Sequence, residues 1–456
     1  MLLSTLLTIS LLAAPQELSI TKSIDTPVEI ASFNGVEVKF EFEDALNIQN
    51  NTTVFIPEFP LGADREVKLR LQRFDIFTPD ARVVVGTTNV DGEIVHATMK
   101  KPNLVLLRGA IYNEPDSKVF LALGENASNG LIESNGITYI LTEHKEKKWT
   151  AVYNLNDVDP ADMNWTDFQC DVIAAQQPIE RKAQNAKRSI GGDCQALQIA
   201  IDTDWEFTGN LFGGSTSASG EYAATLLGAV SSIYERDVNV ELQISYLRLW
   251  ANSSDPWSAG STGNQLTQFR SYWESNMSDV DRHLAHLFSG RGLGGGIAWV
   301  GATCTSFGYA VSANLSGSFP LPLVDHSHNN WDVMVVAHEL GHNCGTWHTH
   351  DYSPPIDNCG NGDCTDPWGG TIMSYCHTCS GGMSNIVLSL HPRVQTTIED
   401  YFATLSTCNL DCNPNITGVC CIDESCSETL EEECLSSGGL FLGTGTLCIA
   451  DSCDPT

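Results

Sequence analysis

One run of eleven residues constrains this chain more than any other feature of the sequence. Residues 338–348 read H-E-L-G-H-N-C-G-T-W-H. Residues four apart on a helix lie on one face, so the imidazoles of His338 and His342 can bind one metal ion. Gly345 can adopt the left-handed conformation that ends a helix, and the chain then turns back to bring His348 to the same ion. The run therefore predicts a helix, a tight turn and a metal site with three histidine ligands.

The number and type of ligands indicate what this metal site does. Three imidazoles leave one position of a tetrahedral zinc ion open, and an open position distinguishes a catalytic zinc site from a structural one. Glu339 lies one residue along the helix from a ligand, which suits a carboxylate that acts as a general base. Cys344 follows His342 by two residues and points to the far side of the helix, so we expect it to pack rather than to bind metal. We therefore expect one catalytic Zn²⁺ and Glu339 as its general base. The predicted metal ligands are His338, His342 and His348.

A second motif follows the histidine run, and Gly370–Cys376 reads G-T-I-M-S-Y-C. Together the two motifs resemble the zinc site and the underlying Met-turn of metzincin proteases. Residues 295–301 (G-G-I-A-W-V-G) and 283–290 (H-L-A-H-L-F-S-G) resemble the edge-strand and helix segments of the adamalysin, or reprolysin, branch. The resemblance covers about residues 193–410.

The chain departs from that branch at two positions. The branch usually has an aspartate directly after the third histidine, whereas Thr349 and His350 precede Asp351 here. Tyr375, two residues after Met373, is more reminiscent of astacins and serralysins. An astacin-like or pappalysin-like metzincin is therefore the alternative within the same superfamily.

The resemblance implies a secreted zinc endopeptidase that acts on protein or peptide substrates and is made as a zymogen. Met373 would form the apolar floor of the zinc site. Tyr375 would either donate a hydrogen bond to the oxyanion, or bind the zinc as a fifth ligand, or only pack beneath the histidines. We expect substrate to pair, backbone to backbone, with the edge strand. The residues of that strand are Gly296, Ile297, Ala298, Trp299 and Val300.

The pattern along the 456 residues indicates several folded units. Residues 1–16 read as a secretory signal peptide, and residues 17–188 contain short strand-like runs typical of a β-rich domain. Residues 189–412 alternate strand and helix patterns, and residues 413–456 are rich in cysteine. We therefore expect an α/β metzincin-like catalytic domain, a twisted mixed sheet with an active-site helix, preceded by a β-rich propeptide and followed by a small disulfide-rich module.

Individual elements of the catalytic domain can be predicted from the period of the apolar residues. Residues 197–201 and 238–250 read as strands. Residues 221–235, 265–273, 280–288, 332–344 and 393–405 read as helices.

The junction between the first two large units is polar and contains two basic pairs, the second ending at Arg188. Such a segment suits a processing protease that cuts after Arg188 and releases a propeptide. The alternative is an ordinary linker between two permanent domains. Cys170 lies before this junction and would either present its thiolate to the zinc as a cysteine switch or form a disulfide with Cys194.

Sixteen cysteines favour an oxidising, extracellular compartment. Six of them lie in the tail after residue 413 and suggest three disulfides, while eight others in the catalytic domain could form four. No other apolar run is long enough to span a bilayer, so we expect a secreted product without a transmembrane anchor. The ligand of the tail cannot be derived from the sequence.

A net charge of −32 argues against nucleic acid as a partner, because phosphate binding needs clustered lysine and arginine. The acidic loop 357–366 could bind Ca²⁺, although it lacks a regular calcium-loop spacing and also suits a solvated surface. A different class of function is a catalytically idle adhesion or binding protein that keeps the same scaffold. The intact Glu339 favours the enzyme over that alternative.

Overall fold

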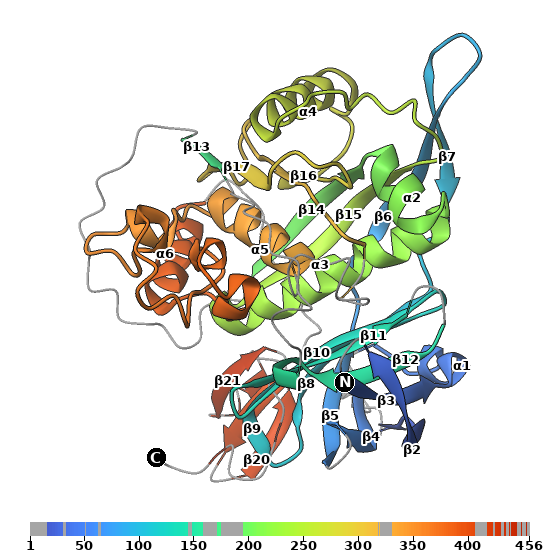
Figure 1. The fold of residues 1–456 in the computed structure, drawn as a ribbon, viewed down its shortest axis with the longest axis vertical. Helices are drawn as coiled ribbons and strands as arrows, with labels where there is room; N and C mark the ends of the chain where they lie inside the picture. The colour runs from blue at the N-terminus through green and yellow to red at the C-terminus, as the bar shows by residue number, and fades with distance from the viewer. Residues whose placement is uncertain are drawn as a thin grey trace, which may run out of the picture.

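The computed structural model describes residues 16–30, 33–50, 52–62, 65–144, 148–157, 171–174, 195–317, 319, 331–405 and, in the tail, 417–422, 425–429, 433–434, 437, 439–444, 448 and 453. Two large sheets lie on opposite sides of one long helix, α3 (Thr216–Val238) (Figure 1). The metal-binding motif lies in the half of the molecule that contains the smaller of these sheets.

The smaller sheet has eight strands and contains segments from both halves of the chain. Its order is β13 (Asp171–Ala174), β17 (Gly296–Val300), β18 (Tyr309–Ser312), β16 (Leu284–Phe288), β14 (Gln195–Thr203), β15 (Val240–Trp250), β6 (Phe77–Thr88) and β7 (Ile94–Met99). The pairs β17–β18 and β6–β7 are antiparallel, and the other neighbours are parallel. The mixed sheet expected for the catalytic domain is therefore present.

Five helices accompany this sheet. They are α2 (Trp205–Phe212), α3, α4 (Thr262–Asn276), α5 (Trp331–Asn343) and α6 (Pro392–Phe402). Local sequence explains two of their starts, because the side chains of Asp204 and Ser215 accept hydrogen bonds from the first-turn backbone of α2 and α3. Helix α3 is buried along most of its length, since its small and apolar residues pack against both large sheets. Helices α3, α4, α5 and α6 agree with the sequence predictions to within a few residues, except that α3 also extends beyond the predicted start.

One element prediction is wrong. Residues 280–288, read as a helix, contain the strand β16 instead, which lies between β14 and β18 and is parallel to both. All five of its side chains are buried. A strand buried on both faces is a continuous apolar run, and such a run lacks the alternation that distinguishes a strand from a buried helix.

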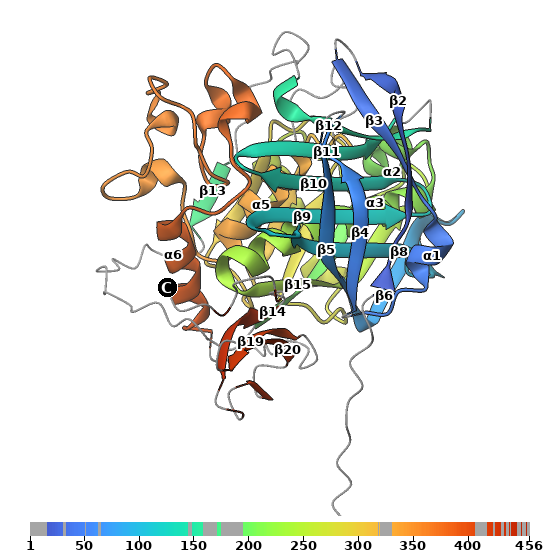
Figure 2. The same ribbon diagram turned by 90° about the horizontal axis from the view of Figure 1, so that it is seen from below.

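The larger sheet has ten strands and belongs to the N-terminal part of the chain. Its order is β1 (Gln16–Glu17), β4 (Thr53–Pro60), β5 (Glu66–Phe74), β8 (Leu104–Ile111), β9 (Glu114–Gly124), β10 (Ser128–Ser134), β11 (Ile137–Glu143), β12 (Thr150–Asn154), β3 (Phe33–Phe40) and β2 (Ile20–Ile30). The short helix α1 (Phe42–Leu46) follows β3. Seen from below, strands of this sheet lie across α3 (Figure 2). The β-rich character expected of this part is present.

Strands of the ten-stranded sheet are apolar on both faces. In β8, Val105 and Leu107 pack into a core inside the N-terminal part, while Leu106 between them packs into the core that contains α3 and α5. In β9, Leu121 and Phe120 divide in the same way. Because neighbouring side chains of a strand point to opposite faces, one sheet serves two cores.

The tail contains a third sheet, with β19 (Gly418–Ile422) between β20 (Ser425–Thr429) and β21 (Leu440–Thr444). Its three disulfides, as expected, are Cys420–Cys434, Cys421–Cys453 and Cys426–Cys448. In the catalytic part, Cys359–Cys376 and Cys364–Cys379 are bridged, and Cys304 is also disulfide-bonded. Short 3-10 helices are η1 (Leu155–Asp157), η4 (Thr349–Asp351), η5 (Cys359–Asn361), η6 (Cys376–Thr378) and η7 (Gly382–Asn385). Among the described residues, no helix is both long enough and apolar enough to cross a membrane.

Candidate active site

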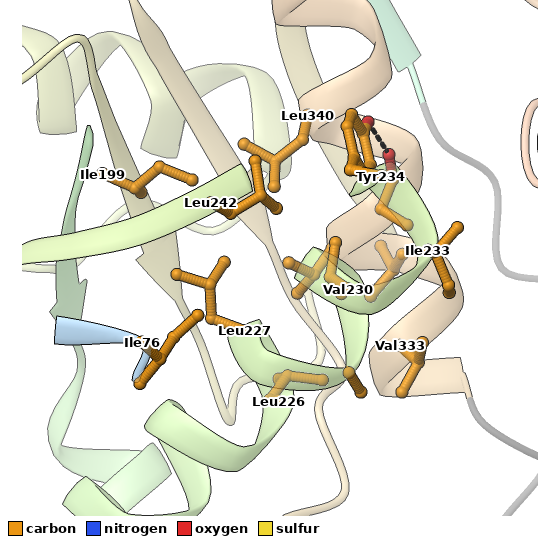
Figure 3. Packing of buried hydrophobic residues seen from close by; sticks show 14 of the residues in the cluster. Ile76, Ile199, Leu226, Leu227, Val230, Ile233, Tyr234, Leu242, Val333 and Leu340 are labelled. Atoms are coloured by element: carbon orange, nitrogen blue, oxygen red, sulfur yellow. Dashed lines mark hydrogen bonds between the residues drawn. The ribbon is translucent and has the colours of Figure 1, made fainter. Parts of the chain in front are cut away.

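Helix α5 carries the first half of the histidine motif, and every one of its residues is buried. Its run of valine, methionine and alanine residues packs into the central core (Figure 3), where the hydroxyl of Tyr234 donates to the Ala337 carbonyl over 2.7 Å. The helix ends at Asn343, and Gly345 has φ of +90°, in the left-handed region predicted for it. Cys344 is a buried free thiol, in agreement with the packing role expected from its position.

The three histidines of the motif converge. The ligand atoms of His338, His342 and His348 all lie within 4.8 Å of one another, and all three side chains are buried. The Nε2 atoms of His338 and His342 are 3.1 Å apart. Burial, and after it the neighbouring imidazoles, holds the pKa of these two histidines well below the usual range. They are therefore neutral, which is the form that binds metal.

Backbone carbonyls determine which nitrogen of each helical histidine carries the proton. The Nδ1 atom of His338 lies 2.6 Å from the Ile372 carbonyl, and that of His342 lies 2.9 Å from the Thr346 carbonyl. A carbonyl can only accept, so both Nδ1 atoms must donate and both Nε2 atoms carry lone pairs.

Two facing lone pairs repel each other unless a cation lies between them. The Nε2 atom of His348 is also buried and has no hydrogen-bond partner among the described residues. These three acceptors fit a metal ion such as zinc, which neutral imidazoles bind through one ring nitrogen while the other is held by an acceptor.

Glu339 lies beside the start of β17. Its side chain is fully buried, and a Cβ atom added to Gly296 would come within 2.2 Å of its Oε1 atom. The first residue of β17 therefore passes the carboxylate so closely that a larger side chain there would displace Glu339.

Hydrogen bonds fix the edge strand to the end of α5. The Nδ2 atom of Asn343 donates to the carbonyls of Trp299 and Tyr309 over 2.9 and 3.2 Å. The Gly301 amide donates to the His342 carbonyl over 2.8 Å. Strand β17 and the metal ligands are thus held in one rigid arrangement.

The Met-turn lies under the histidines. Met373 is fully buried, and a Cβ atom added to Gly341, between the two helical histidines, would come within 2.6 Å of its Sδ atom. A hydrogen bond also links the turn to the loop that carries His348, since the Thr349 amide donates to the Met373 carbonyl over 3.0 Å. Met373 therefore packs against α5 as an apolar support, while the neighbouring carbonyl orients His338.

Comparison with known proteins agrees with this geometry. A reprolysin profile, described as metallo-peptidase family M12, matches residues 195–387. Residues 195–387 are therefore similar to reprolysin-like metzincin domains. The match favours the reprolysin branch over the astacin-like and pappalysin-like alternatives.

One relative and one solved structure are also similar to this chain. The human disintegrin and metalloproteinase domain-containing protein 9 is 29% identical over 165 residues, which is 36% of this chain and 19% of that protein. The chain thus spans about a fifth of that relative's length. The crystal structure of metalloproteinase-II from Bacteroides fragilis is 12% identical, with a TM-score of 0.43 over 85% of this chain and 98% of that one.

Tyr375 lies at the rim of the histidine cluster. Its ring centroid is 4.5 Å from that of His348 and 6.3 Å from that of His338. The ring of His350 is stacked on His348 on the same side, with centroids 5.1 Å apart. This position is compatible with all three roles predicted for Tyr375.

Asp351 has a role that the sequence alone did not suggest. Its Oδ2 atom lies 3.3 Å from the Nδ1 atom of His348, and this contact is the main cause that lowers the pKa of the carboxyl. The imidazole of His348 is therefore oriented by a side chain, whereas those of His338 and His342 are oriented by backbone carbonyls. One sequence feature could have pointed to Asp351. The reprolysin branch has an aspartate directly after its third histidine, and in this chain that aspartate is displaced by two residues.

The outer edge of β17 is paired with a strand from before the catalytic domain. Strand β13 runs parallel to β17, with Asp171 opposite Ile297 and Ala174 opposite Val300 (Figure 1). The edge on which substrate was expected is thus covered by the chain itself. Cys170, Arg188 and Cys194 lie outside the described residues.

The acidic loop 357–366 lines a cavity of about 430 Å³ that Trp368 also borders. Among the described residues, the group of possible ligands in this region is Asp357, Cys359 and Cys376, and the two cysteines are joined in a disulfide. A bridged cysteine offers no thiolate to a metal. Ca²⁺ binding by this loop stays a prediction.

Proposed function

We propose that this protein is a secreted zinc-dependent endopeptidase, made as a zymogen, that hydrolyses peptide bonds in protein or peptide substrates. The observation that carries the proposal is the convergence of three buried imidazole lone pairs next to a buried carboxylate, Glu339, at the edge of a strand. The M12 family match supports a metalloprotease of this kind.

The residues around the site divide the chemistry between them. Zinc bound by the three histidines would polarise the scissile carbonyl and lower the pKa of a water molecule towards about 7. Glu339 accepts the proton of the attacking water and then delivers it to the departing amine. Tyr375, whose ring lies next to that of His348, would donate a hydrogen bond to the oxyanion.

The substrate backbone binds to β17. The parallel pairing of β13 with this strand indicates that the outer edge of β17 can accept an added strand. Substrate would replace β13 there, and its scissile bond would lie next to Glu339, because Gly296 at the start of β17 contacts that carboxylate. The five residues of the proposed substrate strand are Gly296, Ile297, Ala298, Trp299 and Val300.

Latency follows from the same pairing. Strand β13 precedes Arg188 in the chain. A cut after Arg188 would therefore break the covalent link between β13 and the catalytic domain. Cys170 directly precedes β13 in the sequence. A thiolate of Cys170 would act as the switch, while a disulfide to Cys194 is the alternative. The disulfides of the tail and the catalytic part support an extracellular location.

Activity of the processed protein on a denatured protein substrate tests the proposal. We expect cleavage that a chelator abolishes, and that Glu339→Gln abolishes while zinc stays bound. Glu399→Gln, the same isosteric change at an exposed carboxylate of α6, should leave cleavage unchanged. Cleavage by Glu339→Gln would refute the base assignment, and no cleavage by the processed protein would favour the idle binding protein.

A further inference from the structure

We propose that the N-terminal unit, defined as residues 16–157, stays bound to the catalytic domain after processing as a permanent non-covalent subunit, and that activation displaces only β13. The retention of the unit follows from its contacts alone. The displacement of β13 rests on the proposed zymogen function.

The first observation is that the N-terminal unit completes the catalytic sheet. Strand β6 runs parallel to β15, with Gly86 opposite Trp250, and β7 then closes the sheet as its edge strand. In Figure 1 this hairpin extends from the N-terminal half upward along the right-hand side of the catalytic half. Loss of the unit would leave the long, buried strand β15 with an open edge, which soluble proteins avoid.

The contact between these strands is close as well as long. A Cβ atom added to Gly86 would come within 3.0 Å of the Trp250 indole, and Trp250 is fully buried. The imidazole of His96, in β7, lies 3.2 Å from the guanidinium of Arg248, which is also fully buried. The hairpin therefore covers an aromatic and charged interior of the catalytic domain.

The second observation is a shared hydrophobic core. Leu106, Phe120 and Tyr153 of the N-terminal unit are buried in the same cluster as α3 and α5. Figure 3 shows Ile76 of the unit near Leu227 of α3. Small residues of α3 permit this approach, since a Cβ atom on Gly228 would come within 2.9 Å of Leu106. Separation would expose a continuous apolar face on both parts, which is unfavourable in water.

The third observation concerns the carboxylates of α3, which have partners in the N-terminal unit. Glu235 forms a buried ion pair with Arg108. Glu221 accepts hydrogen bonds from the Ala127 amide over 2.9 Å and from the Asn126 side chain over 2.8 Å. Burial of such groups is tolerated only when their partners are present. The face of α3 is thus built for a permanent partner.

The tail also contacts the N-terminal unit. Glu428 in β20 forms an ion pair with Arg70 in β5 and accepts a hydrogen bond from Thr53 over 3.1 Å. Figure 1 shows the tail strands beside the ten-stranded sheet. The tail follows the catalytic domain in the sequence, so a cut at Arg188 does not separate it from that domain. Two elements on the C-terminal side of the cut therefore bind the unit.

Strand β13 differs from the rest in how it is held. It is four residues long and pairs with one strand, β17, at the edge of its sheet. A short edge strand opens locally at much lower free energy than a shared core. A cut in residues 175–194 would free its C-terminal end while the unit itself stays in place.

Native size-exclusion chromatography after a defined cut tests retention. The full chain would carry Glu339→Gln to prevent autolysis, a recognition site for a sequence-specific protease within residues 180–186, and Cys170→Ser. No cysteine precedes Cys170, so this variant cannot link the N-terminal fragment through a disulfide. We expect the two fragments to co-elute after complete cleavage. Elution of a separate N-terminal fragment would overturn the proposal.

A charge reversal at the interface provides a matched comparison in the same cleaved chain. Arg108→Glu places a like charge against Glu235 and should weaken retention at least tenfold. Lys118→Glu makes the same change in charge at a pair with Glu133 within the N-terminal unit, and should retain the fragment. Equal retention in both variants would show that the buried ion pair does not determine retention of the fragment. If Arg108→Glu fails to fold, the cleaved chain without this substitution still tests retention.

Activity distinguishes failure of this inference from failure of the proposed function. With Glu339 restored, the cleaved complex should hydrolyse a denatured protein while the N-terminal fragment is still bound. Activity that appears only in fractions without the fragment would show that the whole unit, not β13, inhibits. Co-elution without activity in any fraction would leave retention intact and refute the protease proposal and the displacement of β13.

Discussion

At the scale of single residues, the site depends on atoms that hold the histidines rather than on the histidines alone. Each ligand has its Nδ1 atom at an acceptor, and for His348 this acceptor is the carboxylate of Asp351. Such second contacts fix the tautomer and the orientation of a metal-binding imidazole.

Asp351→Ala should therefore weaken zinc binding by about 10- to 100-fold, because the ring of His348 loses its orienting carboxylate. A competition titration with a chromogenic zinc chelator measures this affinity. Asp366→Ala, at an exposed acid of the neighbouring loop, is the matched control and should bind zinc like the unaltered chain. Equal affinity in the two variants would contradict the orienting role of Asp351.

Gly296→Ala should lower kcat/KM by about 10²-fold, the loss that a displacement of about 1 Å from the reactive geometry produces. The added methyl would meet the carboxylate of Glu339. Zinc content should not change, since no metal ligand moves. Gly292→Ala is the control, because its nearest contact at that position would be an ordinary 3.6 Å from Asn314. Full activity of Gly296→Ala would show that catalysis does not require the close approach of β17 to the carboxylate of Glu339.

The convergence of His338, His342 and His348 could be predicted from the sequence because their spacing follows directly from the geometry of a helix and a glycine turn. Gly296 and Asn343 gave no such signal. Their roles depend on contacts between segments that are distant along the chain, such as the bonds from Asn343 to Trp299 and Tyr309. Asp351 was noticed as a departure from the family pattern, yet only the folded loop shows its contact with His348.

At the scale of elements, most helices could be predicted from their apolar period, while buried strands could not be separated from helices. Strand β16 illustrates the limit, since its five buried residues include His286, three positions after His283. Both histidines fall in the segment 280–288, which the sequence predicts as a helix. In the structure His286 is fully buried, and its Nε2 atom lies 2.8 Å from the Ser312 hydroxyl in the neighbouring strand.

Burial of His286 predicts a dependence of stability on pH. Burial lowers the pKa of this imidazole to about 3 from the usual 6.5. Between these values the unfolded chain takes up a proton that the folded chain does not, so stability falls as the pH decreases. The contribution is up to about 1.4 kcal/mol per pH unit.

Chemical denaturation of His286→Gln between pH 6.5 and pH 4 measures this effect. The variant should show a shallower loss of unfolding free energy on acidification than the unaltered chain. Ser312→Ala removes the same hydrogen bond without removing the titrating group, so it should lower stability and keep the slope. An unchanged slope in His286→Gln would show that the imidazole is protonated within the fold.

At the scale of the whole molecule, strands from the N-terminal part lie at both edges of the catalytic sheet, β13 at one and β7 at the other. The sequence contained a sign that the ten-stranded sheet is covered on both faces. The run from Leu104 to Leu107 is continuously apolar, as a strand buried on both faces must be. The sequence could not show what covers the second face of the ten-stranded sheet, or that β6 pairs with β15. Both depend on contacts between residues that are distant along the chain.

The central claim is that three imidazoles bind one zinc ion with no thiolate, and X-ray absorption at the zinc edge tests it most directly. The measurement uses the folded Cys170→Ser chain, in which the sulfur of the proposed switch is absent. We predict one zinc per chain, with a shell of nitrogen and oxygen atoms at about 2.0–2.1 Å. A folded chain that takes up no zinc, or zinc with sulfur at about 2.3 Å, would contradict the claim.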